Sequence, residues 1–348
     1  MKYIFSFLLA FGAYTLSLAQ THFGNSVGVQ GAWHSFFGVR AGQNNTGSFN
    51  SFMGHRAGMN NTVGYENNFL GAYTGLANTT GHHNVFVGRS AGGSNTTGQY
   101  NAFLGHAAGM ANTNGHRNTF LGHRAGNSNQ SGSHNTYLGV RTAHNNVSGH
   151  YNTAVGSQAG HNNTGSKNVF IGHQAGYLET GSNQLYIHNS DAPIPLIYGD
   201  FAAGGVGINT KKLVDPLDGA FYTLSVNGLV RTTELRVYPG WADYVFATNY
   251  RLRPLEEVAR YIEKNKHLPD VPSAKEVARH GVKVGEMDAT LLRKIEELTL
   301  YMIEADKTAQ SLQQTLTQTE KHLTKLRKEA TQVKKKYRKR KLASSNTH

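Results

Sequence analysis

The sequence from His34 to residue 182 is built from one repeating unit of 16 or 17 residues. The unit reads approximately N-x-F-φ-G-x-x-A-G-x-x-N-T-x-G, where φ is an aliphatic residue or Met. Of the nine units, the first is led by His34 and the other eight by asparagines: Asn50, Asn67, Asn84, Asn101, Asn118, Asn135, Asn152 and Asn168. This period is too short for a helix pair with its turns, and it suits one coil of a β-solenoid.

The glycines of the unit indicate how the chain can turn so often. Gly supplies 40 of the 348 residues, above the usual share of roughly 7%. In the unit led by Asn118, we expect Gly122 and Gly126 at two corners and Gly132 at the close of the unit. Gly adopts positive φ without steric cost, and Asn tolerates the left-handed region. Stacked coils would place Asn over Asn about 4.8 Å apart, which predicts amide ladders along the axis.

Each unit also contains an adjacent apolar pair, such as Phe103-Leu104 or Phe120-Leu121. Neighbouring residues on a strand point to opposite faces, so one member fills the coil and the other faces outward. Over nine coils the outward members form an apolar stripe too long to leave in water. We therefore expect a homo-oligomer whose copies bury their stripes against one another.

These repeats resemble the heads of trimeric autotransporter adhesins, whose coils form a left-handed parallel β-roll. The shared features are the Asn-led strand, the aliphatic-Gly step and the later Ala-Gly corner, over residues 34–181. The resemblance implies a homotrimeric head that binds a glycan or protein on a host or microbial surface.

The first 19 residues have the pattern of a signal peptide. Lys2 precedes the apolar stretch 3–11, and Ser17-Leu18-Ala19 offers small residues for cleavage. No later segment approaches the 18 apolar residues of a membrane span. We expect a secreted or cell-surface protein, although the sequence does not indicate how it would be anchored. Cys is absent, which excludes disulfide scaffolds, cysteine nucleophiles and thiolate metal sites.

Three other features of the head suggest chemistry. His55, His106, His123 and His173 each follow the strand Gly, which would suit a metal site or, as we favour, a solvated face. Asn-x-Ser/Thr triplets recur in phase with the coil, so turn chemistry accounts for them better than glycosylation. The Gly-rich spacings lack the Lys of a phosphate loop. We expect neither a metal nor a cofactor.

Residues 183–240 change pattern and predict a small β neck or connector. The segments 204–209 and 224–228 have the composition of short strands, and Thr232–Tyr238 alternates in a way that suggests one more. The segment is similar to the necks of phage tail fibres and related surface fibres.

Residues 241–290 predict a small α-rich domain. Glu256–Lys264 has helical apolar spacing, and Ser273 is suited to cap a helix at Ala274–Arg279. The strings His267–Ser273 and Leu291–Glu304 resemble the C-terminal intramolecular chaperone domain of phage tail spikes, in the variant found on bacterial surface fibres. That resemblance spans residues 241–304 and implies a module that nucleates trimer assembly.

The resembled family often cleaves itself at a Ser-Asp-x-Arg-x-Lys motif. The matching positions here are Thr248, Asn249, Arg251 and Arg253, where Thr, Asn and Arg replace the Ser, Asp and Lys. Arginine stays protonated and is a poor general base for a hydroxyl. We therefore expect no self-cleavage and no catalytic residues.

Residues 291–341 predict a coiled-coil helix with a basic end. Apolar positions alternate steps of four and three from Leu291 to Tyr337, which is typical of a left-handed coiled coil. The predicted trimer core at its start consists of Leu291, Ile295, Leu298 and Met302. Residues 321–341 hold 11 Lys and Arg against Glu329 alone.

The basic run Lys334–Lys341 has three readings. It could bind nucleic acid, but an exported chain would not meet nucleic acid in the cell. It could instead contact an anionic cell surface, or it could be a solvated helix end. The formal net charge of the whole chain is +13.

Together these patterns predict a fibrous trimer with a β-solenoid (parallel β-roll) head, a small β neck, an α-rich chaperone-like domain and a C-terminal coiled coil. The expected role is adhesion or surface display without catalysis. The alternatives are a self-cleaving chaperone, a tail-spike-like polysaccharide depolymerase and a phage structural fibre. A depolymerase needs two carboxylates at catalytic separation, whereas residues 33–181 contain only Glu66 and Glu179.

Overall fold

The computed structural model describes residues 21–23, 33–238, 240 and 244–345. The proposed signal peptide and Trp241 lie outside the described residues. The chain divides into two compact units, Met1–Arg231 and Thr232–His348. Each unit is described by itself.

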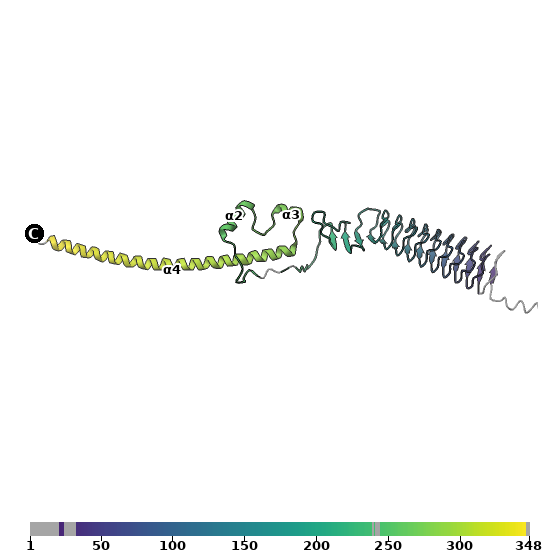
Figure 1. The fold of residues 1–348 in the computed structure, drawn as a ribbon, viewed down its shortest axis with the longest axis horizontal. Coiled ribbons are helices and arrows are strands. Elements are labelled where there is room, and N and C mark those ends of the chain that lie inside the picture. The colour runs from purple at the N-terminus through teal and green to yellow at the C-terminus, as the bar shows by residue number, and fades with distance from the viewer. Residues whose placement is uncertain (1–20, 24–32, 239, 241–243, 346–348) are drawn as a thin grey trace, which may run out of the picture. The chain divides into compact units, whose positions relative to one another are not determined.

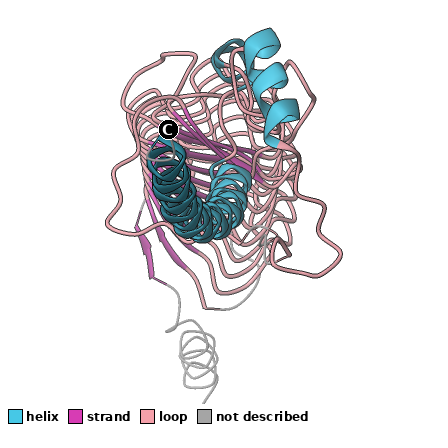
Figure 2. Cartoon of the chain, turned by 90° about the vertical axis from the view of Figure 1, so that its left-hand side faces the viewer, coloured by secondary structure: helices cyan, strands magenta, loops and turns pink. Residues whose placement is uncertain are grey.

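The first unit is a β-solenoid. Its strands β1 to β11 pair in parallel, each with the strand of the next coil (Figure 1). Viewed along the molecule, the strands overlie one another in one layer (Figure 2). The first ten are β1 (Thr21–Phe23), β2 (Ser35–Phe37), β3 (Ser51–Met53), β4 (Asn68–Leu70), β5 (Val85–Val87), β6 (Ala102–Leu104), β7 (Thr119–Leu121), β8 (Thr136–Leu138), β9 (Thr153–Val155) and β10 (Val169–Ile171). The repeat thus forms the predicted solenoid, one strand to a coil.

The core of the solenoid is a column of aromatic rings. Phe36, Phe52, Phe69, Phe86, Phe103, Phe120 and Tyr137 are buried, and each ring is stacked on the next. The centroids of successive rings lie 4.7 to 4.9 Å apart, which matches the strand spacing. Small side chains such as Ala91, Ala108 and Ala125 line the other side of the core. The coil is therefore thin, with one ring filling each layer.

Two columns of buried asparagines join the coils. Leading asparagines bond mainly to backbone: Asn101 donates through Nδ2 to the Gly115 carbonyl at 2.8 Å, and its Oδ1 accepts from the Asn118 amide at 3.0 Å. The direct amide ladder lies in a second column, where Asn112 Nδ2 donates to Asn95 Oδ1 at 2.7 Å. This second column comprises Asn45, Asn61, Asn78, Asn95, Asn112, Asn129, Asn146 and Asn163. Four of its members begin Asn-x-Ser/Thr triplets, and their burial fits a structural role.

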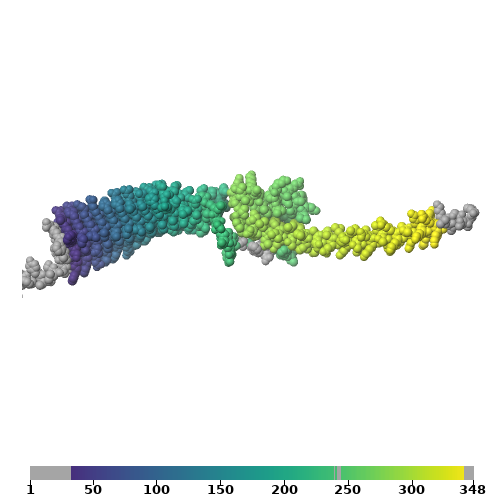
Figure 3. Space-filling model, turned by 180° about the vertical axis from the view of Figure 1, so that it is seen from behind, coloured from purple at the N-terminus to yellow at the C-terminus, as the bar shows by residue number. Residues whose placement is uncertain are grey.

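The corners of each coil need positive φ. In the coil of β7, Gly122 has φ +137° and Gly126 has φ +55°. A Cβ on Gly126 would lie 2.6 Å from the Phe120 ring, and one on Gly132 would lie 2.4 Å from the Gly149 carbonyl oxygen. The solenoid therefore depends on glycine for close packing as well as for turning. Residue colour changes steadily along this unit in the space-filling view, as stacked layers require (Figure 3).

The parallel ladder continues past the last repeat into β11 (Gln184–Ile187), which pairs with β10. Three strands follow: β12 (Ile197–Asp200), β13 (Gly205–Ile208) and β14 (Leu224–Val226). The β11–β12 and β12–β13 pairs are antiparallel, and β13–β14 is parallel. The strands predicted at 204–209 and 224–228 are thus present. The strand suggested for Thr232–Tyr238 is wrong, since the described residues there form no ladder.

The second unit is helical. It contains α2 (Leu255–Asn265), α3 (Ala274–His280) and the long α4 (Val284–Ser345). Ser273 caps α3 as predicted, and Glu276 completes a capping box by bonding back to the Ser273 amide. Figure 1 shows α2 and α3 beside the N-terminal part of α4.

Candidate interaction surfaces

The outward face of the strands carries a continuous aliphatic stripe. It consists of the third residue of β2 to β10: Phe37, Met53, Leu70, Val87, Leu104, Leu121, Leu138, Val155 and Ile171. The stripe residues Phe37 and Leu104 are 55% and 39% exposed, whereas the preceding ring residue in each strand is buried, as in Phe36 and Phe103. The prediction of one inward and one outward apolar residue is confirmed, with Ala154 in place of a ring in β9.

A basic corner lies directly beside this stripe. We use the name for six residues: Arg89, His106, His123, Arg124, Arg141 and His144. Gly122 alone separates the stripe residue Leu121 from His123. The Arg124 amide donates to the His106 carbonyl and the Arg141 amide to the His123 carbonyl, each at 2.9 Å. Successive coils therefore stack these positive side chains above one another.

The basic corner affects the protonation of His123. Burial lowers the pKa of His123 below its ordinary value, and nearby positive charge lowers it further. The contributing groups are His106, Arg124, Arg141 and His144. His106 and His123 are stacked, with ring centroids 5.3 Å apart. The four histidines singled out by the sequence do not gather in one site, because His55 instead packs edge-on against Tyr73.

A second corner, just before each leading asparagine, carries aromatic and basic side chains that pair with one another. His83 stacks on Tyr100 with centroids 4.8 Å apart, and the Arg117 guanidinium lies 5.8 Å from the Tyr100 ring centroid. His134 stacks on Tyr151 at 4.9 Å. The ring faces in this row are used in contacts between neighbouring coils.

The two carboxylates of the head are both engaged. Glu66 lies 2.6 Å from His83 Nε2. Glu179 accepts hydrogen bonds from the Gly181 amide and the Tyr186 hydroxyl, and it pairs with Lys211 at 3.4 Å. They lie in coils with many strands between them, so they do not form the carboxylate pair of a depolymerase.

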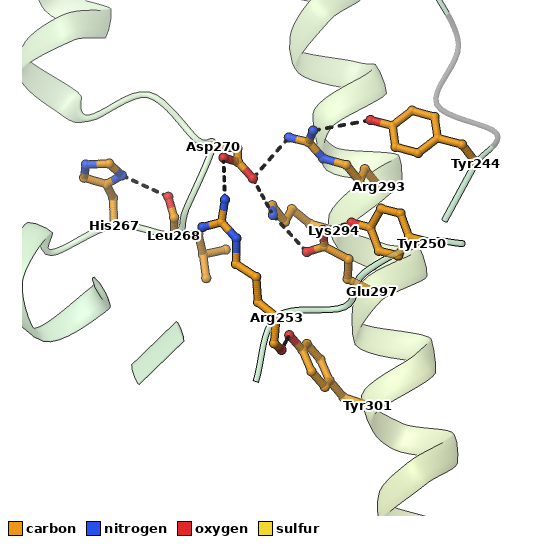
Figure 4. Close-up of polar contacts among 10 residues, drawn as sticks. All are labelled: Tyr244, Tyr250, Arg253, His267, Leu268, Asp270, Arg293, Lys294, Glu297 and Tyr301. Carbon is orange, nitrogen blue, oxygen red and sulfur yellow. Dashed lines mark hydrogen bonds and ion pairs between the residues drawn. The ribbon is translucent and has the colours of Figure 1, made fainter. Parts of the chain in front are cut away.

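In the second unit, Asp270 is the centre of a charged cluster (Figure 4). Its carboxylate lies 3.2 Å from Arg253, 3.2 Å from Lys294 and 3.6 Å from Arg293. Burial opposes ionisation, but hydrogen bonding and the three positive charges hold the pKa of Asp270 below its usual value. Lys294 also pairs with Glu297 at 2.8 Å. These ion pairs hold the loop that precedes α3 against helix α4.

Figure 4 also places tyrosines from the segment before α2 against α4. The Tyr250 hydroxyl donates to Glu297, and Arg293 donates to the Tyr244 hydroxyl at 3.4 Å. The backbone oxygen of Arg253 accepts from Tyr301. These bonds bring residues 47 to 49 positions apart in the sequence into contact.

The positions matching the cleavage motif do not assemble into a site. Arg253 is held by Asp270. Within the described chain, the side chains of Thr248, Asn249 and Arg251 are exposed and make no hydrogen bond or ion pair. Among the described residues, the Thr248 side chain has no hydrogen-bond partner that could act as a base.

An apolar groove of about 430 Å³ lies between α2, the 268–269 loop and α4. It is lined by Leu255, Val258, Leu268, Leu291, Ile295 and Leu298, among others. The four residues predicted as trimer core, Leu291 to Met302, lie on the same helix and are 48% to 65% exposed. They form a largely exposed apolar face along α4, which continues through Leu312 and Leu316.

The basic run begins at Lys334 on the exposed part of α4, and residue 340 is the last whose exposure is described. No described helix combines the length and apolar character needed to cross a membrane. Within the described residues, no three His, Asp or Glu side chains gather as metal ligands.

Comparison with known proteins finds no matching family model, no matching curated protein and no matching solved structure.

Sequence reasoning missed both corners as surfaces. Each coil holds two non-glycine residues at positive φ, such as Arg124 at 56° and Arg117 at 55°. The recurrence of His, Arg and Tyr before the leading asparagine and after the strand glycine was a usable signal. The Asp270 cluster had no such signal, because its members lie in separate segments.

Proposed function

We propose that this chain is an exported homotrimeric fibre for adhesion or surface display, and that its C-terminal unit nucleates assembly. The observation that carries the proposal is the aliphatic stripe on β2 to β10. It is a long, regular and exposed apolar face on a rigid solenoid, of the kind that association buries. Identical stripes on parallel copies would match one another coil by coil.

The exposed face of α4 supports the assembly role. Leu291, Ile295 and Leu298 recur with coiled-coil spacing and are 48% to 61% exposed in the single chain. Parallel helices would bring chains together at one end and raise the effective concentration of the heads. A single coil gains little stability until neighbouring coils are in register, so association through the α4 helices would matter during folding.

Non-enzymatic action is part of the proposal. The two carboxylates of residues 33–181 are far apart in the coil order, and among the described residues no base is hydrogen-bonded to the Thr248 side chain. The function would instead come from presenting many copies of a surface along a stiff fibre.

Expression with the native leader tests this function. We expect cleavage after Ala19, surface labelling of intact cells, and adhesion of those cells to a surface that cells without the protein do not bind. A chain carrying Leu104→Glu and Leu121→Glu should lose its oligomeric state and its adhesion. The matched control, Asn114→Glu and Gln130→Glu, adds the same charge at exposed positions in the turns, away from the strand face. Retention of the protein inside the cell, or adhesion by monomers, would contradict the proposal.

A further inference from the structure

We propose that the basic corner of the head is a binding site for an extended acidic polysaccharide. This inference rests on the proposed adhesive function and names the ligand class. Its members are Arg89, His106, His123, Arg124, Arg141 and His144. They lie on the consecutive coils of β5 to β8, so they form a row rather than a closed pocket.

The row has no internal counter-charge. Among the residues that the structure describes, no carboxylate lies within ion-pairing distance of these six side chains. Glu66 is engaged by His83 and Glu179 by Lys211. Positive side chains held near one another without a counter-charge repel one another, so the head carries a row of cations whose charge is not neutralised. A polyanion would remove that repulsion on binding.

The backbone at the row is a second observation. Arg124 and Arg141 have φ of 56° and 53°, a left-handed conformation that residues with a side chain rarely adopt. The same corner has positive φ in every coil, with Ser90, Ala107 and Gln158 at other levels. The conformation is therefore common to the coils, and it holds the two arginines at the same corner of consecutive coils.

The geometry favours a linear ligand with acidic groups at short intervals. The stacked coils repeat about every 4.8 Å, so the positive side chains of the basic corner recur at that interval along the solenoid axis. Nucleic acid is a poorer fit, since single-strand binding relies on aromatic platforms for the bases and the row contains only imidazole rings.

The site should respond to pH. His123 faces His106, Arg124, Arg141 and His144, and its pKa is lowered by burial and by these charges. His123 is therefore mostly neutral near pH 7.5. Protonation at lower pH adds charge to the row, so affinity for a polyanion should rise as the pH falls.

The test uses the full mature chain and two forms of one polymer. Immobilised polygalacturonate supplies a carboxylate on each sugar, and its fully methyl-esterified form supplies the same backbone without charge. We expect binding to the acidic form alone, weakening as salt increases. The Arg124→Gln/Arg141→Gln variant should bind about tenfold more weakly. The matched control is Arg117→Gln/Lys167→Gln, which removes two charges at the other corner and should change affinity less than about threefold. Unchanged circular dichroism would establish that both variants fold.

Several outcomes would overturn the inference. These are equal loss in the two variants, equal binding to the esterified polymer, tighter binding to single-stranded DNA of equal charge, or no gain in affinity between pH 7.5 and 5.5. Adhesion of displaying cells that survives Arg124→Gln/Arg141→Gln would also overturn it, while leaving the proposed function intact. Binding of polygalacturonate by a monomeric or unexported chain, with the loss in Arg124→Gln/Arg141→Gln, would uphold the site and contradict the proposed function.

Discussion

The ring of Phe103 lies parallel to the ring of Phe120 in the next coil, with centroids 4.7 Å apart and planes inclined by 6°. The strand register sets this contact, because Phe103 and Phe120 are direct partners in the β6–β7 pair. Each ring covers one face of its neighbour, so the core is a column that depends on every member.

Phe103→Ala should lower the free energy of unfolding by about 3–5 kcal/mol, since it leaves a ring-sized cavity in the column. Urea unfolding followed by far-UV circular dichroism measures this loss. Val63→Ala is the control, because Val63 is exposed at a turn and should change stability by less than about 0.5 kcal/mol. Similar losses in both variants would mean that the column does not dominate stability.

Gly126→Ala separates steric crowding from backbone strain. Its Cβ would lie 2.6 Å from the Phe120 ring, whereas Gly219 also has positive φ but has no atom within 4 Å of its Cβ position. We expect Gly219→Ala to cost about 1 kcal/mol from strain alone. Gly126→Ala should cost about 1–3 kcal/mol more through overpacking. Equal melting temperatures for the two variants would contradict the packing role of the corner.

Asn101→Ala tests the asparagine columns. The substitution leaves the buried Asn118 amide without its 3.0 Å acceptor, which should cost about 1–3 kcal/mol. Asn114→Ala, at an exposed position in the next corner, should be nearly neutral. A denaturation midpoint that falls equally in both would show that the buried hydrogen bonds add nothing specific.

The repeat pattern predicted the coil, the buried ring and the outward aliphatic residue because all three follow from a period matched to one strand per coil. Strands β1, β11 and β12 lie outside the repeat frame, so the pattern did not predict them. Positive φ at Arg124 could not be predicted, since arginine has no preference for that conformation. The contacts of Asp270 arise only when distant segments fold together.

Asp270 makes the helical unit sensitive to acid. Its folded pKa lies below the ordinary value of about 3.9, so its stabilising effect is present above that pH and is lost as the pH falls through the folded value. Asp270→Asn should cost about 1 kcal/mol at pH 6, since the carboxylate is 38% exposed and solvent screens its ion pairs. Helix melting followed at 222 nm should differ between the variant and the parent at pH 6, and the two should converge as the pH falls through the folded pKa of Asp270. A constant difference at all pH values would contradict this account.

The exposed face of α4 should be required while the chain folds. Ile295→Asp with Leu298→Asp should yield monomers or aggregates, because charge on this face prevents helix pairing. Ser311→Asp with Gln314→Asp places the same charge on the opposite side of the helix and should leave assembly intact. If the variant with Ile295→Asp and Leu298→Asp gave heat-resistant oligomers at wild-type yield, the proposed assembly role of this unit would be wrong.

The most direct test of the account is the mass of the purified mature protein in solution. The chain has a mass of 38.0 kDa, so loss of about 2 kDa of leader leaves about 36 kDa per chain and about 108 kDa for a trimer. Size-exclusion chromatography with light scattering should find the trimer, and intact-mass spectra should find each chain uncut beside Thr248. A stable, soluble monomer of about 36 kDa would contradict the proposal that the aliphatic stripes and the α4 faces are buried between copies.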